Sequence, residues 1–230
     1  MYDLFKTWWF NHCFVCYFSL MFFQLLDDDY SFPNPELAED DGLLAVGGDL
    51  SLERLLLAYE NGIFPWYSED DPICWYAPHE RCVIYPDQIT ISKSMKKVLA
   101  SGTFKVSFDQ AFEEVILNCA KVGRKDQPGT WITKEMQEAY IALHDAGIAH
   151  SIEVWREEML VGGLYGVGIG KVFCGESMFS LESNASKTAL IFLCKSERFE
   201  LIDCQLPNDH LLSMGAVMIS RETYLSTLQS

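Results

Sequence analysis

The segment FCGESMFSLESNASKTALIFLCKSERFELIDCQLPNDH, residues 173 to 210, contains two short apolar strand patterns with a helix pattern between them. The first strand pattern, residues 173 to 180, holds a carboxylate, Glu176, at its middle. The second, residues 201 to 205, ends with Asp203 and Gln205. Between them, residues 184 to 194 start with the cap-forming Asn184 and continue with the apolar spacing of one long buried helix. The segment therefore predicts a strand, helix, strand unit.

The polar residues of these two strands predict a site. Because strand side chains alternate between faces, we expect Glu176 and Met178 to share one face, and Asp203 and Gln205 to share one. If the strands are neighbours, acid and apolar groups line one site. A charge buried among apolar side chains is costly unless it is paired or used. The alternative is that Glu176 and Asp203 are strand-end acids facing water or an internal salt bridge, and spacing alone leaves both interpretations open.

Several long motifs in a fixed order give a resemblance. GESMFS, NASKTAL, LIDCQ and NDH, in this order, resemble the bacterial leucyl/phenylalanyl-tRNA–protein transferases. Further similar motifs upstream are GLLAVGGDLS (42–51), NGIFPWYS (61–68), GTWIT (129–133) and HSIEVWREEMLVGGLYGV (150–167). The resemblance covers about residues 32 to 228.

The composition is typical of a globular protein with one core, or one core plus a small satellite domain. The chain has 230 residues, of which 49% are hydrophobic and 22% charged. Its formal net charge of −16 argues against broad, non-specific nucleic-acid binding, because phosphate contacts need Lys and Arg. Such a charge suits a basic partner.

The eight cysteines are scattered, and only Cys13 and Cys16 form a CxxC pattern. Since no second CxxC or close His pair completes a zinc site, the cysteines indicate free thiols in a reducing cytosol. We therefore expect a cytoplasmic protein without a metal.

The first residues are the only membrane-like segment. Residues 7 to 26 are apolar enough for a span or a signal sequence, but Asn11, His12 and Gln24 interrupt the run and no cleavage site follows. We expect residues 1 to 20 to be a non-native upstream extension, with Met21 as the natural first residue, and no membrane association.

Residues 21 to 80 are expected to form a small N-terminal α/β domain. Ser51 can cap a helix that has Leu52, Leu55, Leu56 and Tyr59 on one face and ends at Gly62. Gly47-Gly48-Asp49 lacks the Lys and the spacing of a P-loop, which favours a tight turn. Without the resemblance, the sequence favours neither a functional role for Trp66 nor a role as a packing residue at a domain interface. The resemblance implies that Trp66 and Trp131 stack against the terminal adenosine of a tRNA.

Residues 81 to 230 are expected to form the larger domain, which begins with a strand at 81 to 85. Lys93, Lys96 and Lys97 form the most basic cluster of the chain. They are either a solvated helix face or, as the resemblance implies, a contact to the tRNA backbone. Ala100 and Ser101 stand where relatives carry further basic residues, so fewer phosphate contacts are expected.

The remaining pattern predicts alternating helices and strands. A helix that starts at Ser107 or Asp109 is expected to bury Phe112, Val115, Ile116 and Cys119, and Thr133 can cap a helix bearing Met136, Tyr140 and Leu143 that ends at Gly147. A β-hairpin follows, with strands at 151 to 155 and 160 to 167. Its order with the later elements is similar to the acetyltransferase (GNAT) core, which the resemblance also implies. The expected fold class is thus α+β, with a GNAT-like C-terminal domain.

The resemblance implies an aminoacyltransferase that moves Leu, and also Phe and Met, from the 3′ end of aminoacyl-tRNA to the α-amino group of proteins with N-terminal Arg or Lys. Such transfer marks these proteins for N-degron degradation. The aminoacyl ester is already activated, so no cofactor is expected, and an α-amino group with a pKa near ~8 needs only a modest base. We expect a monomer.

The resemblance also implies roles for individual residues. Asp203 and Gln205 match a catalytic pair that orients and deprotonates the incoming ammonium, as a proton relay or as anchors, and Glu176 would hold a polar group of the aminoacyl end. The implied aminoacyl pocket consists of Met178, Leu164, Phe173, Leu190 and Leu193. Phe173 and Glu176 have opposite strand parity, so both reach one site only if Gly175 lies at a bulge or turn. Leu193 stands where relatives often have Phe, which leaves the preference between Leu and Phe open.

The sequence also allows two rival functions. An acyl-CoA-dependent acetyltransferase would share the fold order, but residues 180 to 184, SLESN, are acidic and glycine-free, which is poor for pyrophosphate. A non-catalytic adaptor for basic N-termini would need the acidic site but neither the two Trp residues nor Met178.

Overall fold

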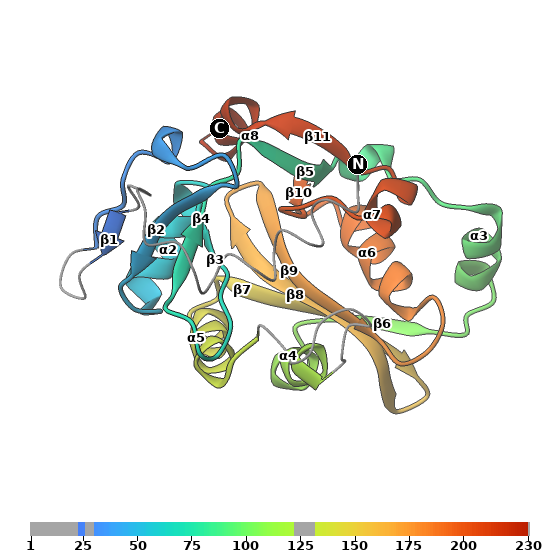
Figure 1. Cartoon of the computed structure of the whole chain (residues 1–230). Helices are drawn as coiled ribbons and strands as arrows, with labels where there is room; N and C mark the ends of the chain where they lie inside the picture. The colour runs from blue at the N-terminus through green and yellow to red at the C-terminus, as the bar shows by residue number, and fades with distance from the viewer. Residues whose placement is uncertain (1–22, 26–29, 122–131, 230) are drawn as a thin grey trace.

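The fold consists of two sheets and the helices that cover them (Figure 1). The structure is a computed structural model that describes residues 23–25, 30–121 and 132–229. The expected extension at residues 1 to 20 and the predicted adenosine contact Trp131 lie outside the described residues. The mixture of sheets and helices confirms the α+β class.

The small sheet has the strand order β1-β2-β4-β3 and the large sheet the order β11-β5-β10-β9-β8-β7-β6. The small sheet consists of β1 (Phe23–Leu25), β2 (Leu43–Gly47), β3 (Phe64–Pro65) and β4 (Cys74–Tyr76). The large sheet consists of β5 (Glu80–Ile84), β6 (Lys105–Phe108), β7 (Ala149–Arg156), β8 (Met159–Ile169), β9 (Val172–Ser180), β10 (Leu201–Asp203) and β11 (Val217–Ser220). The helices are α2 (Leu52–Glu60), α3 (Lys93–Ala100), α4 (Phe112–Lys121), α5 (Lys134–Asp145), α6 (Ala185–Lys195), α7 (Asp209–Ser213) and α8 (Arg221–Leu228), with 3-10 turns η1 (Pro35–Leu37) and η2 (Pro86–Gln88).

The strand, helix, strand unit is present as predicted. β9 and β10 are parallel neighbours in which Ile202 pairs with Phe173 and Asp203 with Cys174. On its other edge β10 pairs with β5 in the antiparallel direction. Because β10 ends at Asp203, its pairing with β9 ends at Cys174, one residue before Gly175.

The helix caps of α2 and α5 follow the sequence. The Ser51 hydroxyl accepts from the Arg54 N–H at the start of α2, and the Thr133 hydroxyl accepts from the Met136 N–H at the start of α5. Leu55 and Tyr59 of α2 are buried as expected, whereas Leu52 and Leu56 are only partly buried. The predicted face of α5 is confirmed, since Met136, Tyr140 and Leu143 are buried.

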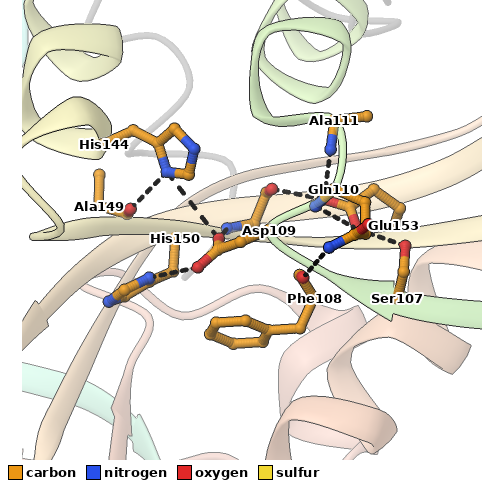
Figure 2. A network of polar contacts seen from close by, with 10 residues as sticks. Ser107, Phe108, Asp109, Gln110, Ala111, His144, Ala149, His150 and Glu153 are labelled. Carbon is orange, nitrogen blue, oxygen red and sulfur yellow. Dashed lines mark hydrogen bonds and ion pairs between the residues drawn. The ribbon is translucent and has the colours of Figure 1, made fainter.

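The start of α4 differs from the prediction. Ser107 lies in β6, and Asp109 precedes the helix with a φ of 55°. The N–H groups of Gln110 and Ala111 donate to the carboxylate of Glu153, at 3.3 and 3.4 Å, so a buried residue of β7 takes the place of a local cap (Figure 2). The predicted inward face of α4 is nevertheless correct, because its four residues are buried.

The start of α6 also corrects a prediction. Asn184 precedes this helix in the left-handed conformation, with a φ of 75°, and its side chain makes no capping hydrogen bond. The Ser180 hydroxyl at the end of β9 accepts instead from the Ser186 N–H at 3.2 Å. The end of the strand therefore caps the helix that follows it.

Two apolar clusters cover the two faces of the large sheet. The first cluster joins α2, α4, α5 and α8 to β8, β9 and the small sheet, and it contains Tyr59, Trp75, Tyr140 and Tyr224. The second cluster lies under α6 and contains Leu164, Phe173, Leu190, Leu193 and Ile202. The first cluster thus links both sheets. The chain passes from the small to the large sheet between residues 76 and 80, and the division into domains at residues 80 and 81 stays a prediction.

None of the helices in the described ranges is both long and apolar enough to span a membrane.

Candidate active site

A β-bulge in β9 decides where the acidic residue points. Gly175 and Ser177 pair with Gly166 and Tyr165 of β8, which leaves Glu176 without a partner on that strand. A Cβ atom on Gly166 would stand 2.2 Å from the Cys174 carbonyl oxygen, so the close approach of the strands at the bulge requires glycine. The bulge expected near Gly175 is therefore present.

The bulge has a different effect from the one expected. The Glu176 side chain lies against α2 and α5, whereas Met178 packs on the α6 side of the sheet with Phe173. The expectation that Glu176 and Met178 share a face is wrong, because the extra residue reverses the alternation between them. Phe173 and Glu176 remain on opposite faces of β9.

The five predicted pocket residues lie together in the second cluster. Met178 stands directly opposite Leu164 in the pairing of β9 with β8. The ring of Phe173 packs at a tilt against that of Phe199, with 5.1 Å between the ring centroids. Leu164, Phe173, Leu190 and Leu193 are buried, and Met178 is partly exposed. The apolar pocket residues and the acidic residues therefore lie on opposite faces of the sheet, on either side of the place where the β9–β10 pairing ends beside Gly175.

Two tyrosines that sequence reasoning did not assign to the site hold Glu176. Tyr59 donates to Oε1 at 2.8 Å, Tyr140 donates to Oε2 at 3.1 Å, and the two hydroxyls also contact each other. Burial raises the pKa of Glu176 to about 7, although the two tyrosine hydrogen bonds oppose this shift. Burial also raises the pKa of both tyrosines well above the usual range, so both remain neutral donors.

Asp203 is buried completely and forms a salt bridge with Arg81. The Nε atom of Arg81 lies 3.1 Å from each carboxylate oxygen of Asp203. The backbone N–H of Gln205 donates to Asp203 Oδ1 at 2.8 Å. The internal salt bridge that the sequence left open as an alternative is thus what Asp203 forms, and its carboxylate also shapes the turn that follows β10.

Gln205 lies in that turn with a φ of 55°, a left-handed conformation that is uncommon for a residue with a side chain. Its carbonyl accepts from the Cys82 N–H at 3.1 Å, and its side-chain Nε2 donates to Glu176 Oε1 at 3.4 Å. Glu176, Asp203 and Gln205 are therefore brought together. We call these three residues, with Tyr59, Tyr140 and Arg81, the polar cluster.

The sequence held partial signals for the three members that it did not identify. Tyr59 and Tyr140 were placed on inward helix faces, where a hydroxyl needs a partner. Arg81 opens an apolar strand pattern, where a cation needs an anion. The partner of each one is far away in the sequence, which local spacing cannot reveal.

The predicted tRNA contacts lie in two separate places. Trp66 follows β3, is partly buried, and packs edge-on against Tyr76 with 6.0 Å between ring centroids. Lys93, Lys96 and Lys97 are exposed on α3, which lies at the end of the molecule opposite to α2 and β3 (Figure 1). Across the described part of the chain, no group of three His, Cys, Asp or Glu side chains could hold a metal ion.

The sequence matches the family described as leucyl/phenylalanyl-tRNA protein transferase over residues 83–229, and the N-terminal domain of that family over residues 48–79. A leucyl/phenylalanyl-tRNA–protein transferase of Flavobacterium johnsoniae is 54% identical over 205 residues, which cover 88% of this chain and 97% of that relative. Another, of Syntrophus aciditrophicus, is 57% identical over 201 residues, with 86% and 84% covered. A solved structure of a functionally unknown conserved protein from Staphylococcus epidermidis is similar with a TM-score of 0.44 and 11% identity, and the match covers 77% of this chain and 68% of that one.

Proposed function

Because the chain belongs to the family of leucyl/phenylalanyl-tRNA–protein transferases, we propose that it moves leucine, and also phenylalanine and methionine, from aminoacyl-tRNA to proteins that begin with Arg or Lys. The family makes the chain an aminoacyltransferase. The observation that carries the proposal is the match over most of the chain to relatives more than half identical to it. The transfer marks its protein substrates for N-degron degradation.

The reaction forms a peptide bond without ATP. The acceptor α-amine attacks the ester carbonyl carbon, a C–N bond forms, and the C–O bond to the tRNA breaks. The proton lost by the amine goes to the 3′ oxygen, which leaves as a hydroxyl. Holding two substrates in the right geometry supplies much of the acceleration of such a step.

The polar cluster is suited to this chemistry. Glu176, with a pKa of about 7, exists as carboxylate and as acid at neutral pH and can bind an ammonium group or accept its proton. Gln205 is partly exposed, and its amide is fixed beside Glu176. Asp203 is engaged by Arg81 and by the Gln205 N–H, which supports an anchoring role over a proton relay.

The aminoacyl side chain is proposed to enter the second cluster beside Gly175, where the pairing of β9 with β10 ends. A slot of flexible Met and Leu side chains admits Leu, Phe or Met and excludes side chains branched at Cβ by shape. Trp66 and Trp131 are proposed to stack on the terminal adenosine, and the lysines of α3 to contact the tRNA backbone.

The free cysteines Cys82, Cys119, Cys174 and Cys194 are buried, which fits the cytoplasmic location that we propose. We further propose that the protein acts as a monomer and that its larger domain is an acetyltransferase-like core.

The test is transfer of radiolabelled leucine from leucyl-tRNA to peptides that differ only in their first residue. Peptides with N-terminal Lys or Arg are expected to be labelled, and peptides that begin with Met or with acetylated Lys are not. Labelling of the Met peptide at the same rate contradicts the proposed acceptor. Binding of the Lys peptide without transfer identifies an adaptor, and saturable binding of acetyl-CoA identifies an acetyltransferase.

Two variants test the proposed site in the same assay. Gln205→Ala leaves the Arg81–Asp203 salt bridge in place and is expected to lose most of the transfer, as is Asp203→Ala. Thermal melting checks that each variant is folded. Full transfer by folded Gln205→Ala would refute the proposed active site but would leave the family assignment unchanged.

A further inference from the structure

Arg81 makes several contacts besides its ion pair with Asp203. Its Nε atom binds the carboxylate of Asp203, and its Nη2 atom donates to the Gly62 carbonyl at 3.0 Å. The guanidinium carbon lies 4.8 Å from the centroid of the Phe64 ring and 4.5 Å from that of Tyr224. One buried side chain of β5 therefore reaches the turn after β10 and the turn before β3.

We propose that Arg81 is a positioning residue that holds Gln205 and Trp66 in a fixed relation to each other, by binding Asp203 on one side and the Gly62 carbonyl on the other. The proposal rests on the site described above, in which Gln205 meets the reacting groups and Trp66 meets the adenosine. Arg81 itself is 2% exposed, so the proposed role is to position other residues and involves no direct contact with either substrate.

The link from Arg81 to Gln205 passes through Asp203. The carboxylate accepts from Arg81 and from the Gln205 backbone N–H, and β5 adds a second support because the Cys82 N–H donates to the Gln205 carbonyl. A charged acceptor makes a stronger hydrogen bond than a neutral one. The left-handed backbone of Gln205 persists only where its surroundings fix it. Without the guanidinium, Asp203 would be a buried carboxylate lacking its cation, and the turn would lose its anchor.

The link from Arg81 to Trp66 passes through the segment 62–66. Gly62 has a φ of 70°, and a Cβ atom there would lie 2.8 Å from Leu225 Cδ2 and 3.1 Å from Tyr224 Cε1. The carbonyl that Arg81 binds is thus held in place by α8. Phe64 lies under the guanidinium, and the Trp66 N–H donates to the Cys74 carbonyl at 2.8 Å. The chain between the two anchors leaves Trp66 little freedom.

Arg54 provides a matched control. It is also completely buried, its Nε lies 3.4 Å from Asp49 Oδ1, and its guanidinium packs 5.1 Å from the Tyr30 ring centroid. Neither Asp49 nor Tyr30 is among the residues proposed to touch substrate. If the loss of any buried arginine were enough to slow transfer, variants at Arg54 and at Arg81 should both be slow.

The experiment measures the transfer rate at saturating leucyl-tRNA and Lys-initiated peptide, together with the melting temperature, for Arg81→Gln, Asp203→Asn, their double variant, Gln205→Ala and Arg54→Gln. Arg81→Gln and Asp203→Asn are each expected to slow the reaction about a hundredfold, the size of effect that a misplaced catalytic group produces. Because both changes act through the same turn, the double variant is expected to be about as slow as either single variant. Arg54→Gln is expected to melt at a lower temperature and to react within about twofold of the wild-type rate.

The proposal is overturned if the double variant slows transfer by the product of the two single effects. It is also overturned if Arg54→Gln transfers leucine as slowly as Arg81→Gln. If Arg81→Gln does not fold, Arg81→Lys takes its place, because it keeps the charge but loses the fork that binds Asp203 and Gly62 together. Wild-type transfer by folded Arg81→Lys overturns the proposal as well. Full transfer by Gln205→Ala, in contrast, refutes the site on which the proposal rests.

Discussion

Glu176 gives the stability of the protein a dependence on pH whose sign follows from the raised pKa. In the folded protein the pKa is about 7, compared with 4.5 for an ordinary Glu, so the folded state holds the proton more tightly. Glu176 therefore contributes stability that is fully present below about pH 4.5 and is lost as the pH rises through about 7. From pH 5 to pH 8, the melting temperature of the wild type is expected to fall relative to that of Glu176→Gln. If the difference between the two melting temperatures is the same at pH 5 and pH 8, the raised pKa of Glu176 is contradicted.

Tyr59 tunes this titration. Its hydroxyl donates to Glu176 Oε1 at 2.8 Å and thereby stabilises the carboxylate. Tyr59→Phe removes the donor, so the pKa of Glu176 is expected to rise further and the pH-dependent change in stability to move to higher pH. The measurement is the same melting series. Tyr67→Phe is the control, because the Tyr67 hydroxyl bonds to Glu135 at 3.3 Å, and it should leave the transition at its wild-type pH.

The β8–β9 pair is the element on which the geometry of the site depends. Gly166→Ala would place a Cβ atom 2.2 Å from the Cys174 carbonyl and 2.6 Å from Phe173 Cε1, so the bulge beside Glu176 must shift. We expect a loss in the free energy of unfolding of about 3 kcal/mol and a large loss of transfer. The control on the same strand is Gly168→Ala, whose Cβ atom would come no closer than 3.3 Å, to the side chain of Phe199. Denaturant unfolding of both variants checks the contrast, and equal losses would contradict it.

The elements show which parts of the site the sequence could predict. The strand, helix, strand unit was predicted correctly because the apolar spacing of residues 173 to 205 is a local property. The face of Met178 was predicted wrongly, because the bulge depends on Gly166 of the neighbouring strand. Asp203 and Arg81 lie 122 residues apart, and α4 is capped by Glu153 of β7. Contacts of this kind arise only when distant segments pack together, so spacing within one segment carries no signal for them.

The charge of the protein and the distance between its predicted tRNA contacts limit how a tRNA can bind. The chain has a formal net charge of −16, and its basic cluster on α3 lies opposite to the β3 end that carries Trp66 (Figure 1). A tRNA whose terminal adenosine stacks on Trp66 must therefore extend across the molecule to reach α3. We therefore propose that the lysines contact the body of the tRNA and have no part in the chemistry at its 3′ end.

This separation predicts that binding and chemistry can be changed independently. Replacing Lys93, Lys96 and Lys97 by Ala is expected to raise KM for leucyl-tRNA without changing kcat, and to reduce the slope of log binding constant against log salt by about 0.9 per lost duplex phosphate contact. The same variant should react at the wild-type rate with a minimal donor, leucyl-adenosine. The matched control removes Lys134 and Lys171, which pair with Glu138 at 3.4 Å and Glu200 at 3.0 Å, and it should leave KM and the salt slope unchanged. If the α3 variant slows the minimal donor as much as leucyl-tRNA, these lysines support the fold, and the tRNA follows another surface.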